Sequence, residues 1–351
     1  MNFADRIIAW QKQHGRHDLP WQRTQDAYRI WLSEIMLQQT QVATVIPYYQ
    51  RFIVRFPDVR ALASAPVESV MASWAGLGYY SRARNLHRCA QRIVETYYGE
   101  FPRSVEQLVQ LPGIGRSTAA AIAALAFGQR AAILDGNVRR VLARQFGIEG
   151  YLGNSLIERV FWRRAESLLP TDAIEVYTQG LMDLGATVCT RSLPICAACP
   201  VSGTCVARNA QTIDKLPTPR PVRERPVRAA MVLVIRDASG AVLLELRPPS
   251  GIWGGLLSLP EFDSEASDDE VLAAVRSRFG LHITLEQALG QVRHEFTHYT
   301  YLIRPRLAKV AGAAGVANSS LRPVHEDALE AAPLPAPIRR LLLHLLKPAL
   351  V

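Results

Sequence analysis

Apolar residues recur at helical spacing through most of the first 210 residues. Prolines and glycines separate these segments, and no stretch alternates in the manner of a half-buried strand. We therefore expect residues 1–210 to form an all-α domain that begins with an amphipathic N-terminal helix. The further predicted helices are residues 26–40, 42–55, 79–97, 116–126, 137–146, 155–168 and 173–187.

The pattern changes after residue 210. Residues 211–228 contain four prolines and five basic residues without an apolar period, which is typical of an interdomain linker. Beyond the linker, short apolar runs bounded by turn residues predict an α+β domain over residues 229–351. Its predicted strands are residues 231–237 and 241–247, joined by a hairpin turn, and 289–296 and 299–308, and its predicted helices are residues 268–279 and 336–346.

Length and charge narrow the class of protein. At 351 residues the chain is long enough for two domains, and its formal net charge is +9. Residues 1–220 contain 25 basic and 17 acidic residues, so a polyanion such as nucleic acid is a fitting partner for the first domain. No apolar run is long enough for a membrane span, and the N-terminus lacks the features of a signal peptide. We expect a cytoplasmic monomer with no membrane partner.

Four of the five cysteines are clustered in a loop over residues 189–205. Six, two and five residues separate Cys189, Cys196, Cys199 and Cys205. Clustered thiols in a cytoplasmic chain favour a metal site over disulfides. This spacing favours a [4Fe–4S] cluster, and a zinc knuckle is the alternative. Cys89 is isolated in a helical pattern and is interpreted as a buried apolar residue.

Glu34 is the one charge in the middle of a stretch, residues 28–41, that is apolar over most of its helical circumference. A carboxylate in such surroundings is costly unless it is paired or holds a proton. Two interpretations follow at this point. Glu34 pairs with an arginine elsewhere in the core, or it is a functional carboxyl group with a raised pKa.

Two further motifs stand at the starts of helices. In residues 104–126, Gly113 and Gly115 permit a tight turn that opens a helix, whose free N–H groups form an anion site. This pattern predicts a helix-hairpin-helix that holds a DNA phosphate without reading sequence. Asp135 follows an apolar segment and precedes the predicted helix 137–146. It is either a simple helix N-cap or a carboxylate that the cap position holds for chemistry.

The order of these motifs resembles the endonuclease III superfamily of DNA glycosylases, and within it the A/G-specific adenine DNA glycosylases. The resemblance covers nearly the whole chain. The stretches that show it are residues 19–21, 31–49, 76–87, 111–119, 134–144, 182–196, 247–262 and 294–299.

The resemblance implies removal of adenine mispaired with 8-oxoguanine or guanine in double-stranded DNA. The adenine would be flipped out of the duplex into a pocket lined by Arg16 and Trp21. Glu34 would be the acid/base group that protonates the adenine N7, and an ionised Asp135 would stabilise the oxocarbenium-like sugar. The implied DNA contacts are Gln38, Gln39, Thr40, Tyr79, Gly113, Gly115, Arg116 and Ser117. For Trp21 and Tyr79, ordinary core packing is the alternative.

Ser117 bears on the type of reaction. In the lyase branch of the superfamily this hairpin position is a lysine that attacks the sugar. A serine cannot form a Schiff base, so the resemblance implies a monofunctional glycosylase with no significant lyase activity.

The second domain resembles Nudix hydrolases, and Gly255 and Glu261 match the start of their motif. Where the metal-binding glutamates should follow, the chain has residues 273–274 (Ala-Ala) or 277–278 (Ser-Arg), depending on the count. Diphosphate hydrolysis is therefore not expected. The resemblance implies instead that Phe296, Thr297 and His298 recognise 8-oxoguanine; a hairpin tip that contacts nothing is the alternative.

The sequence alone is compatible with three other functions. They are a pyrimidine-directed glycosylase, a DNA-binding module that senses redox state without catalysis, and an active Nudix hydrolase. Glu34 in place of a neutral residue, together with the second domain, argues against the first of these. The pair of Glu34 and Asp135 argues against the second, and the missing glutamates argue against the third.

Overall fold

The computed structural model describes residues 1–151, 153–221, 224–249, 251–311 and 320–346. The chain divides into two compact units. One unit comprises Met1–Ala65 and Asn85–Val222, and the other comprises Pro66–Arg84 and Arg223–Val351. No helix within the described ranges is long and apolar enough to cross a membrane.

The first unit consists of helices, and its described residues contain no strand. This confirms the predicted all-α class. Helix α5 (Val67–Trp74) belongs to the second unit, and α6 (Ser81–Tyr97) contributes to both. The elements of the first unit are α1 (Phe3–His14), α2 (Ala27–Leu37), α3 (Val42–Arg55), α4 (Val59–Ser64), α7 (Val105–Leu108), α8 (Arg116–Phe127), α9 (Gly136–Phe146), α10 (Ser155–Ser167), α11 (Ile174–Asp183), the π-helix η1 (Leu184–Val188), the 3-10 helices η2 (Cys196–Ala198) and η3 (Ser202–Thr204), and α12 (Val206–Asn209).

Several helix bounds differ from the predicted ones. The helix predicted over residues 26–40 ends at Leu37, because Gln39 has a left-handed backbone with φ of 59°. The helix predicted over residues 173–187 is split into α11 and η1. Helices α4 and α5 are too short for a clear period and were not predicted.

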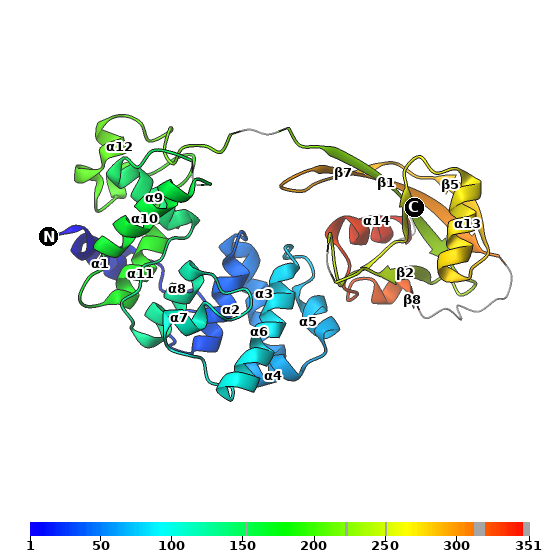
Figure 1. Cartoon of the computed structure of the whole chain (residues 1–351), viewed down its shortest axis with the longest axis horizontal. Helices are drawn as coiled ribbons and strands as arrows, with labels where there is room; N and C mark the ends of the chain where they lie inside the picture. The colour runs from blue at the N-terminus through cyan, green and yellow to red at the C-terminus, as the bar shows by residue number, and fades with distance from the viewer. Residues whose placement is uncertain (152, 222–223, 250, 312–319, 347–351) are drawn as a thin grey trace. The chain divides into compact units, whose positions relative to one another are not determined.

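The alanine-rich helix α8 is the centre of the packing. All six residues of 119–124 are buried, and their small side chains allow α2 and α11 to approach it closely. Helix α1 packs against α11, and α9 lies against α10, α11, α12 and η1 (Figure 1). Gly185 of η1 faces the first turn of α9, where an added Cβ would come within 2.5 Å of the Asn137 Cβ. Glycine therefore lets η1 and the residues that follow it lie directly against the start of α9.

The second unit contains a mixed sheet in the order β3-β2-β1-β7-β5. Strands β1 and β7 are parallel, and the other pairs are antiparallel. Helix α13 (Asp268–Phe279) buries Val271, Val275 and Phe279 against the sheet (Figure 1). The other elements are β1 (Val227–Arg236), β2 (Val242–Leu246), β3 (Leu257–Ser258), β4 (Glu261–Asp263), β5 (Ile283–Ala288), β6 (Val292–Glu295), β7 (Thr300–Val310), β8 (Leu321–Val324), η4 (Glu326–Ala328) and α14 (Ala336–Leu346).

The predicted hairpin between the first two strands is confirmed. Arg236 pairs with Val242, and the Asp237 carboxylate accepts hydrogen bonds from the backbone N–H groups of Ser239 and Ala241. Strand β1 begins at Val227, inside the predicted linker, of which residues 222 and 223 lie outside the described residues. The strand predicted over residues 289–296 is shorter, since β6 covers only Val292–Glu295.

Candidate active site

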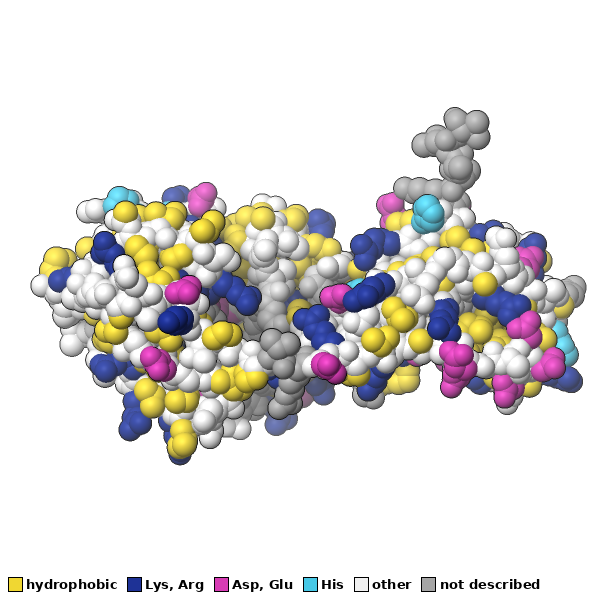
Figure 2. Space-filling model, turned by 90° about the horizontal axis from the view of Figure 1, so that it is seen from above, with side chains coloured by type: hydrophobic (Ala, Val, Ile, Leu, Met, Phe, Trp, Pro, Cys, Tyr) yellow, Lys and Arg dark blue, Asp and Glu magenta, His cyan; other side chains and the backbone are white. Residues whose placement is uncertain are grey.

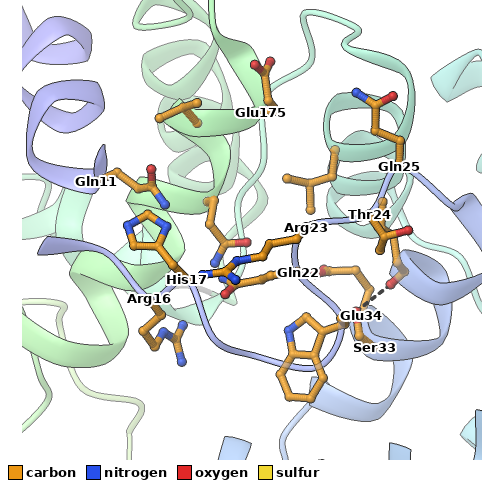
Figure 3. Close-up of a pocket in the computed structure, with 15 residues that line it drawn as sticks. Gln11, Arg16, His17, Gln22, Arg23, Thr24, Gln25, Ser33, Glu34 and Glu175 are labelled. Carbon is orange, nitrogen blue, oxygen red and sulfur yellow. Dashed lines mark hydrogen bonds between the residues drawn. The ribbon is translucent and has the colours of Figure 1, made fainter. Parts of the chain in front are cut away.

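A cavity of about 480 Å³ opens in the first unit beside helix α2. Its walls come from the end of α1, the loop of residues 16–25, and helices α2, α8 and α11 (Figure 3). Three predicted residues, Arg16, Trp21 and Glu34, line it together. The remaining lining residues are Gln11, His17, Gln22, Arg23, Thr24, Gln25, Ile30, Ser33, Leu125, Glu175, Val176 and Gln179.

Glu34 is held in this cavity by an otherwise apolar helix. The side chains of Trp31, Leu32, Ile35 and Met36 are buried around it. Burial raises the pKa of Glu34 to about 8, and the negative charge of Asp135 contributes to the increase. Within the described residues no lysine or arginine lies at ion-pair distance from Glu34. The carboxyl group of Glu34 therefore holds its proton at neutral pH.

Asp135 is the N-cap of α9, and its Oδ1 accepts a hydrogen bond of 2.8 Å from the Val138 N–H. Burial raises the pKa of Asp135 as well. Four influences oppose this increase: backbone hydrogen bonds from Val138 and Asn137, and the positive charges of Arg140 and Arg139. No such contribution stabilises the ionised form of Glu34. The two carboxyl groups therefore differ in their surroundings, because groups that favour an ionised carboxylate lie near Asp135 and not near Glu34.

The helix-hairpin-helix is connected to Asp135 through Ser117. Gly113 lies in the turn between α7 and α8 with φ of 80°, and Gly115 is the N-cap of α8. The Ser117 Oγ accepts a hydrogen bond of 2.9 Å from the backbone N–H of Leu134, the residue before Asp135. Ser117 thus fixes the backbone from which Asp135 projects.

Two of the predicted DNA contacts already have partners inside the protein. The Arg116 guanidinium forms an ion pair with Glu166 and lies 3.8 Å from the centre of the Trp162 ring. The Gln38 Nε2 donates to the Thr118 Oγ1 at 3.3 Å and so links the end of α2 to α8. On the face seen in Figure 2, basic side chains are spread among acidic and apolar ones, so charge there does not mark one DNA-binding patch.

Three other predicted DNA contacts lie in turns. Gln39 is exposed and Thr40 is half-buried in the turn after α2. Tyr79 has φ of 48° and is 44% exposed, in the turn between α5 and α6. Trp21, which was predicted to line the adenine pocket, is 7% exposed, and its ring packs edge-on against Tyr49. Trp21 is therefore both a core residue and a wall of the cavity.

A buried hydrogen-bond network behind the cavity was not predicted from the sequence. Asp183 is fully buried at the end of α11, and its carboxylate accepts hydrogen bonds from the Arg16 N–H (2.9 Å), the Arg16 Nε (2.7 Å) and the Gln179 Nε2 (2.9 Å). This network holds the Arg16 side chain at the cavity wall. The signal for Asp183 was the same as for Glu34, a single charge on the buried face of a helix.

Gln22 was also missed. Its Oε1 accepts a hydrogen bond from the Leu19 N–H, while its Nε2 is buried at the cavity wall without a hydrogen-bond partner among the described residues (Figure 3). A buried donor without a partner is costly, so this amide is available to donate to a molecule in the cavity. No pattern in the sequence distinguishes Gln22 from its polar neighbours.

The four clustered cysteines line one small cavity in the first unit, together with Arg144 and Pro194. Arg144 is 4% exposed and donates hydrogen bonds to the carbonyls of Thr190 (2.7 Å) and Arg191 (3.0 Å), and to the Cys189 Sγ (3.5 Å). Within the described ranges no three histidine, cysteine or carboxylate side chains form a group that could hold a metal ion. The donor set is nevertheless entirely sulfur, which suits an iron–sulfur cluster.

In the second unit, Phe296, Thr297 and His298 form the tip of the β6–β7 hairpin. The Phe296 ring stacks on Tyr299 at 4.7 Å between centroids and lies 5.7 Å from the Trp253 ring. Thr297 and His298 are exposed beyond this aromatic cluster. The hairpin tip thus presents a hydroxyl and an imidazole on a rigid base.

The Nudix-like helix α13 has no glutamate pair at the positions considered above. Arg278 lies there and donates to both oxygens of the Glu245 carboxylate, at 3.0 and 2.9 Å. A cation thus pairs with the carboxylate of Glu245, which is consistent with the expected lack of diphosphate hydrolysis.

Comparisons with known proteins show which family the chain belongs to. Residues 32–167 match the family model of HhH-GPD superfamily base excision DNA repair proteins, and residues 231–344 match that of the NUDIX domain. The adenine DNA glycosylase of Buchnera aphidicola subsp. Acyrthosiphon pisum is 35% identical over 88% of this chain and 87% of its own length. The chain belongs to the adenine DNA glycosylase family. The Homo sapiens adenine DNA glycosylase is 37% identical over 84% of this chain and 65% of its own length.

Solved structures show the same fold for the helical part of this DNA glycosylase. A thermostable thymine-DNA glycosylase matches with a TM-score of 0.52 and 31% identity, over 59% of this chain and 95% of that one. Endonuclease III in a non-covalent DNA complex matches with a TM-score of 0.51 and 22% identity, over 59% of this chain and 94% of that one. The resemblance found in the sequence and the predicted fold class are therefore confirmed.

The raised pKa of Glu34 predicts a pH-dependent stability. The unfolded chain releases this proton near the ordinary value of 4.5, whereas the folded protein keeps it until about pH 8. The stabilisation is therefore complete below pH 4.5 and is lost as the pH rises through 8. Glu34→Gln has no such proton, so its free energy of unfolding should rise relative to the parent by roughly 1 kcal/mol per pH unit between these limits.

Urea unfolding at a series of pH values measures this difference. The matched control is Glu149→Gln, because Glu149 is an exposed glutamate. Its difference from the parent should not change with pH over this range. A Glu34→Gln curve that runs parallel to the Glu149→Gln curve would contradict the assignment.

Proposed function

We propose that this DNA glycosylase hydrolytically removes adenine mispaired with 8-oxoguanine or guanine in double-stranded DNA. The observation that supports the chemistry is the pair of buried carboxyl groups, Glu34 with a pKa of about 8 and Asp135 at the start of α9. The choice of adenine is supported by the family, and the choice of mispair by the hairpin tip of the second unit. The proposal that the protein does not cleave the DNA strand rests on Ser117.

The adenine must leave the duplex before it can reach Glu34. A base inside the stack is inaccessible, and a flipped purine fits a cavity of about 480 Å³. The Gln22 Nε2 offers a donor to a ring nitrogen, and Arg16 is held rigid by Asp183. The cost of flipping is a few kcal/mol and is smallest for a mispaired base.

The first chemical step is protonation of the leaving group. Glu34 donates its proton to N7 of the adenine, so that the base departs from C1′ as a neutral molecule rather than as an anion. General acid catalysis of this kind contributes about 10² to 10⁴ in rate. The acid must be protonated at neutral pH, and the burial of Glu34 meets this requirement.

The second step takes place at the sugar. As the bond from C1′ to the base breaks, positive charge develops on the sugar ring, and the Asp135 carboxylate stabilises it. The Glu34 carboxylate, now ionised, accepts a proton from the water that adds to C1′. This returns Glu34 to its protonated form and leaves an abasic site.

We propose that the reaction ends at the abasic site. A lyase needs an amine nucleophile that forms a Schiff base with C1′. The hairpin has Ser117 at the position of that amine, and its Oγ is engaged with the Leu134 N–H. The protein should therefore not cleave the DNA strand to a significant extent.

We propose further that Cys189, Cys196, Cys199 and Cys205 hold a [4Fe–4S] cluster. The four thiols line one cavity, and the positively charged Arg144 donates a hydrogen bond to the Cys189 Sγ. When bound, the cluster would fix the loop that Arg144 and Arg140 also hold from α9.

In the second unit, Phe296, Thr297 and His298 are the candidates for recognition of 8-oxoguanine. The exposed Thr297 hydroxyl and His298 imidazole provide hydrogen bonds, and Phe296 is braced by Tyr299. These groups can distinguish the oxidised base from guanine by its altered donors and acceptors.

Base release from defined duplexes tests the substrate and the reaction type. Duplexes with one adenine opposite 8-oxoguanine, guanine or thymine, and one with thymine opposite guanine, are incubated with the protein and run with and without alkali. We expect strand breaks only after alkali, fastest for adenine opposite 8-oxoguanine and absent for adenine opposite thymine. Breaks without alkali would contradict the assignment of Ser117, and release of thymine alone would favour a pyrimidine-directed enzyme.

The same assay tests the two carboxyl groups. Glu34→Gln and Asp135→Asn should each lower the single-turnover rate by at least about 100-fold while binding of the mispaired duplex is retained. Glu149→Gln, an exposed substitution, should react like the parent. Unchanged base release by Glu34→Gln would refute the mechanism.

Metal analysis tests the cluster. Protein purified without oxygen should contain about four iron atoms and four sulfides per chain. Cys199→Ser should lose iron, whereas Cys89→Ala, a change at a buried cysteine outside the loop, should retain it. Zinc in place of iron would support the knuckle alternative instead.

A further inference from the structure

The turn that presents Tyr79 has an unusual backbone. Gly76, Gly78 and Tyr79 all have positive φ values, of 107°, 73° and 48°. Glycine adopts such angles freely, but a tyrosine there is strained by about 1 kcal/mol or more. The Tyr79 ring is also 44% exposed, whereas Trp74 and Tyr80 on either side of the turn are buried. Surrounding contacts must therefore hold Tyr79 in place.

One buried guanidinium donates hydrogen bonds to two carbonyl groups of this turn. Arg82, in the first turn of α6, is 8% exposed, and its Nη2 donates to the carbonyls of Leu77 and Gly78 at 3.2 Å each. Its backbone N–H donates to the Tyr79 carbonyl at 2.8 Å. The indole Nε1 of Trp74 donates to the same Gly78 carbonyl at 3.1 Å.

The Arg82 guanidinium also lies between two aromatic rings. It is 5.2 Å from the centre of the Trp74 ring and 5.5 Å from that of Tyr79, both within the range of a cation–π interaction. Burial lowers the pKa of Arg82 to about 10, so the group is still charged at neutral pH. The charge, the hydrogen bonds and the stacking all act on the turn that ends in the exposed ring.

We propose that Arg82 is a positioning residue that holds Tyr79 in the orientation in which it contacts the mispaired duplex. This inference rests on the proposed function, because it assigns to Tyr79 a contact with DNA. An exposed aromatic ring stacks on a base with an energy that depends on how rigidly it is held. Arg82 supplies that rigidity without being exposed itself.

A double-mutant cycle separates this role from simple stabilisation. Binding is measured for a duplex with a non-hydrolysable 2′-fluoro-adenosine opposite 8-oxoguanine and for the undamaged duplex. We expect Arg82→Met and Tyr79→Ala each to lower the preference for the mispair by about tenfold. In the Tyr79→Ala background, Arg82→Met should then have little further effect, because the two residues act through one ring. Equal effects of Arg82→Met in both backgrounds, or none in either, would overturn the proposal.

Two controls complete the cycle. Arg82→Lys keeps the charge but loses the planar fork, so it should restore the preference only in part. Arg88→Met removes a charge from an exposed position of the same helix and should weaken binding to both duplexes alike. An equal loss of preference in Arg88→Met would mean that charge alone is responsible, which contradicts the proposal.

Hydrogen exchange of the protein without DNA tests directly whether Arg82 holds the turn. In Arg82→Met, amides of residues 74–82 should exchange faster while the rest of the protein is unchanged. Unchanged exchange in this segment would overturn the proposal even if the mispair preference fell. If instead the parent protein shows no preference for the mispair, the proposed function fails, and the exchange result still decides whether Arg82 holds the turn.

Discussion

A protonated carboxyl group in an apolar helix is the constraint on which the site depends. Glu34 projects from a helix whose apolar side chains are buried, and burial and the charge of Asp135 both disfavour its ionisation. The two groups are distinguished by their local contacts rather than by their chemistry. Asp135 caps a helix and lies near two arginines, whereas Glu34 has neither advantage. The proposed acid and the proposed anion are thus two similar residues in different surroundings.

Helix α9 connects the main parts of the first unit. Its N-cap is Asp135, and further along it Arg140 and Arg144 donate hydrogen bonds to backbone carbonyls of the cysteine loop, including those of Cys189 and Thr190. The same loop begins directly after η1, which packs against the first turn of α9 through Gly185. The same helix therefore carries Asp135 at its start and holds the cysteine loop along its length.

Features that depend on neighbouring residues could be predicted from the sequence. A carboxyl group in a mostly apolar helix singled out Glu34, a helix start singled out Asp135, and clustered thiols singled out the cysteine loop, whereas the roles of the two carboxyl groups were implied by the family resemblance. The pairing of Arg16 with Asp183 could not be predicted, because 167 residues separate them in the chain. The hydrogen bond from Leu134 to Ser117 could not be predicted either, because these residues are also far apart in the sequence.

Some elements of the second unit also could not be predicted from the pattern of apolar and polar residues. Strands β3, β4 and β8 are two to four residues long, so an alternation cannot be recognised in them. Strand β5 is half polar, and of its residues only Ile283 is buried, so it was not predicted. Its position is set by pairing with β7 rather than by its own composition.

The pH dependence of adenine release is the most direct test of the account. The apparent second-order rate constant on a duplex with adenine opposite 8-oxoguanine reports the ionisable groups of the free enzyme. It should be level around neutral pH and fall about tenfold per pH unit above about 8, as Glu34 loses its proton. A rate constant that stays level or rises well above pH 8 would show that the proton on Glu34 is not the one given to the leaving base.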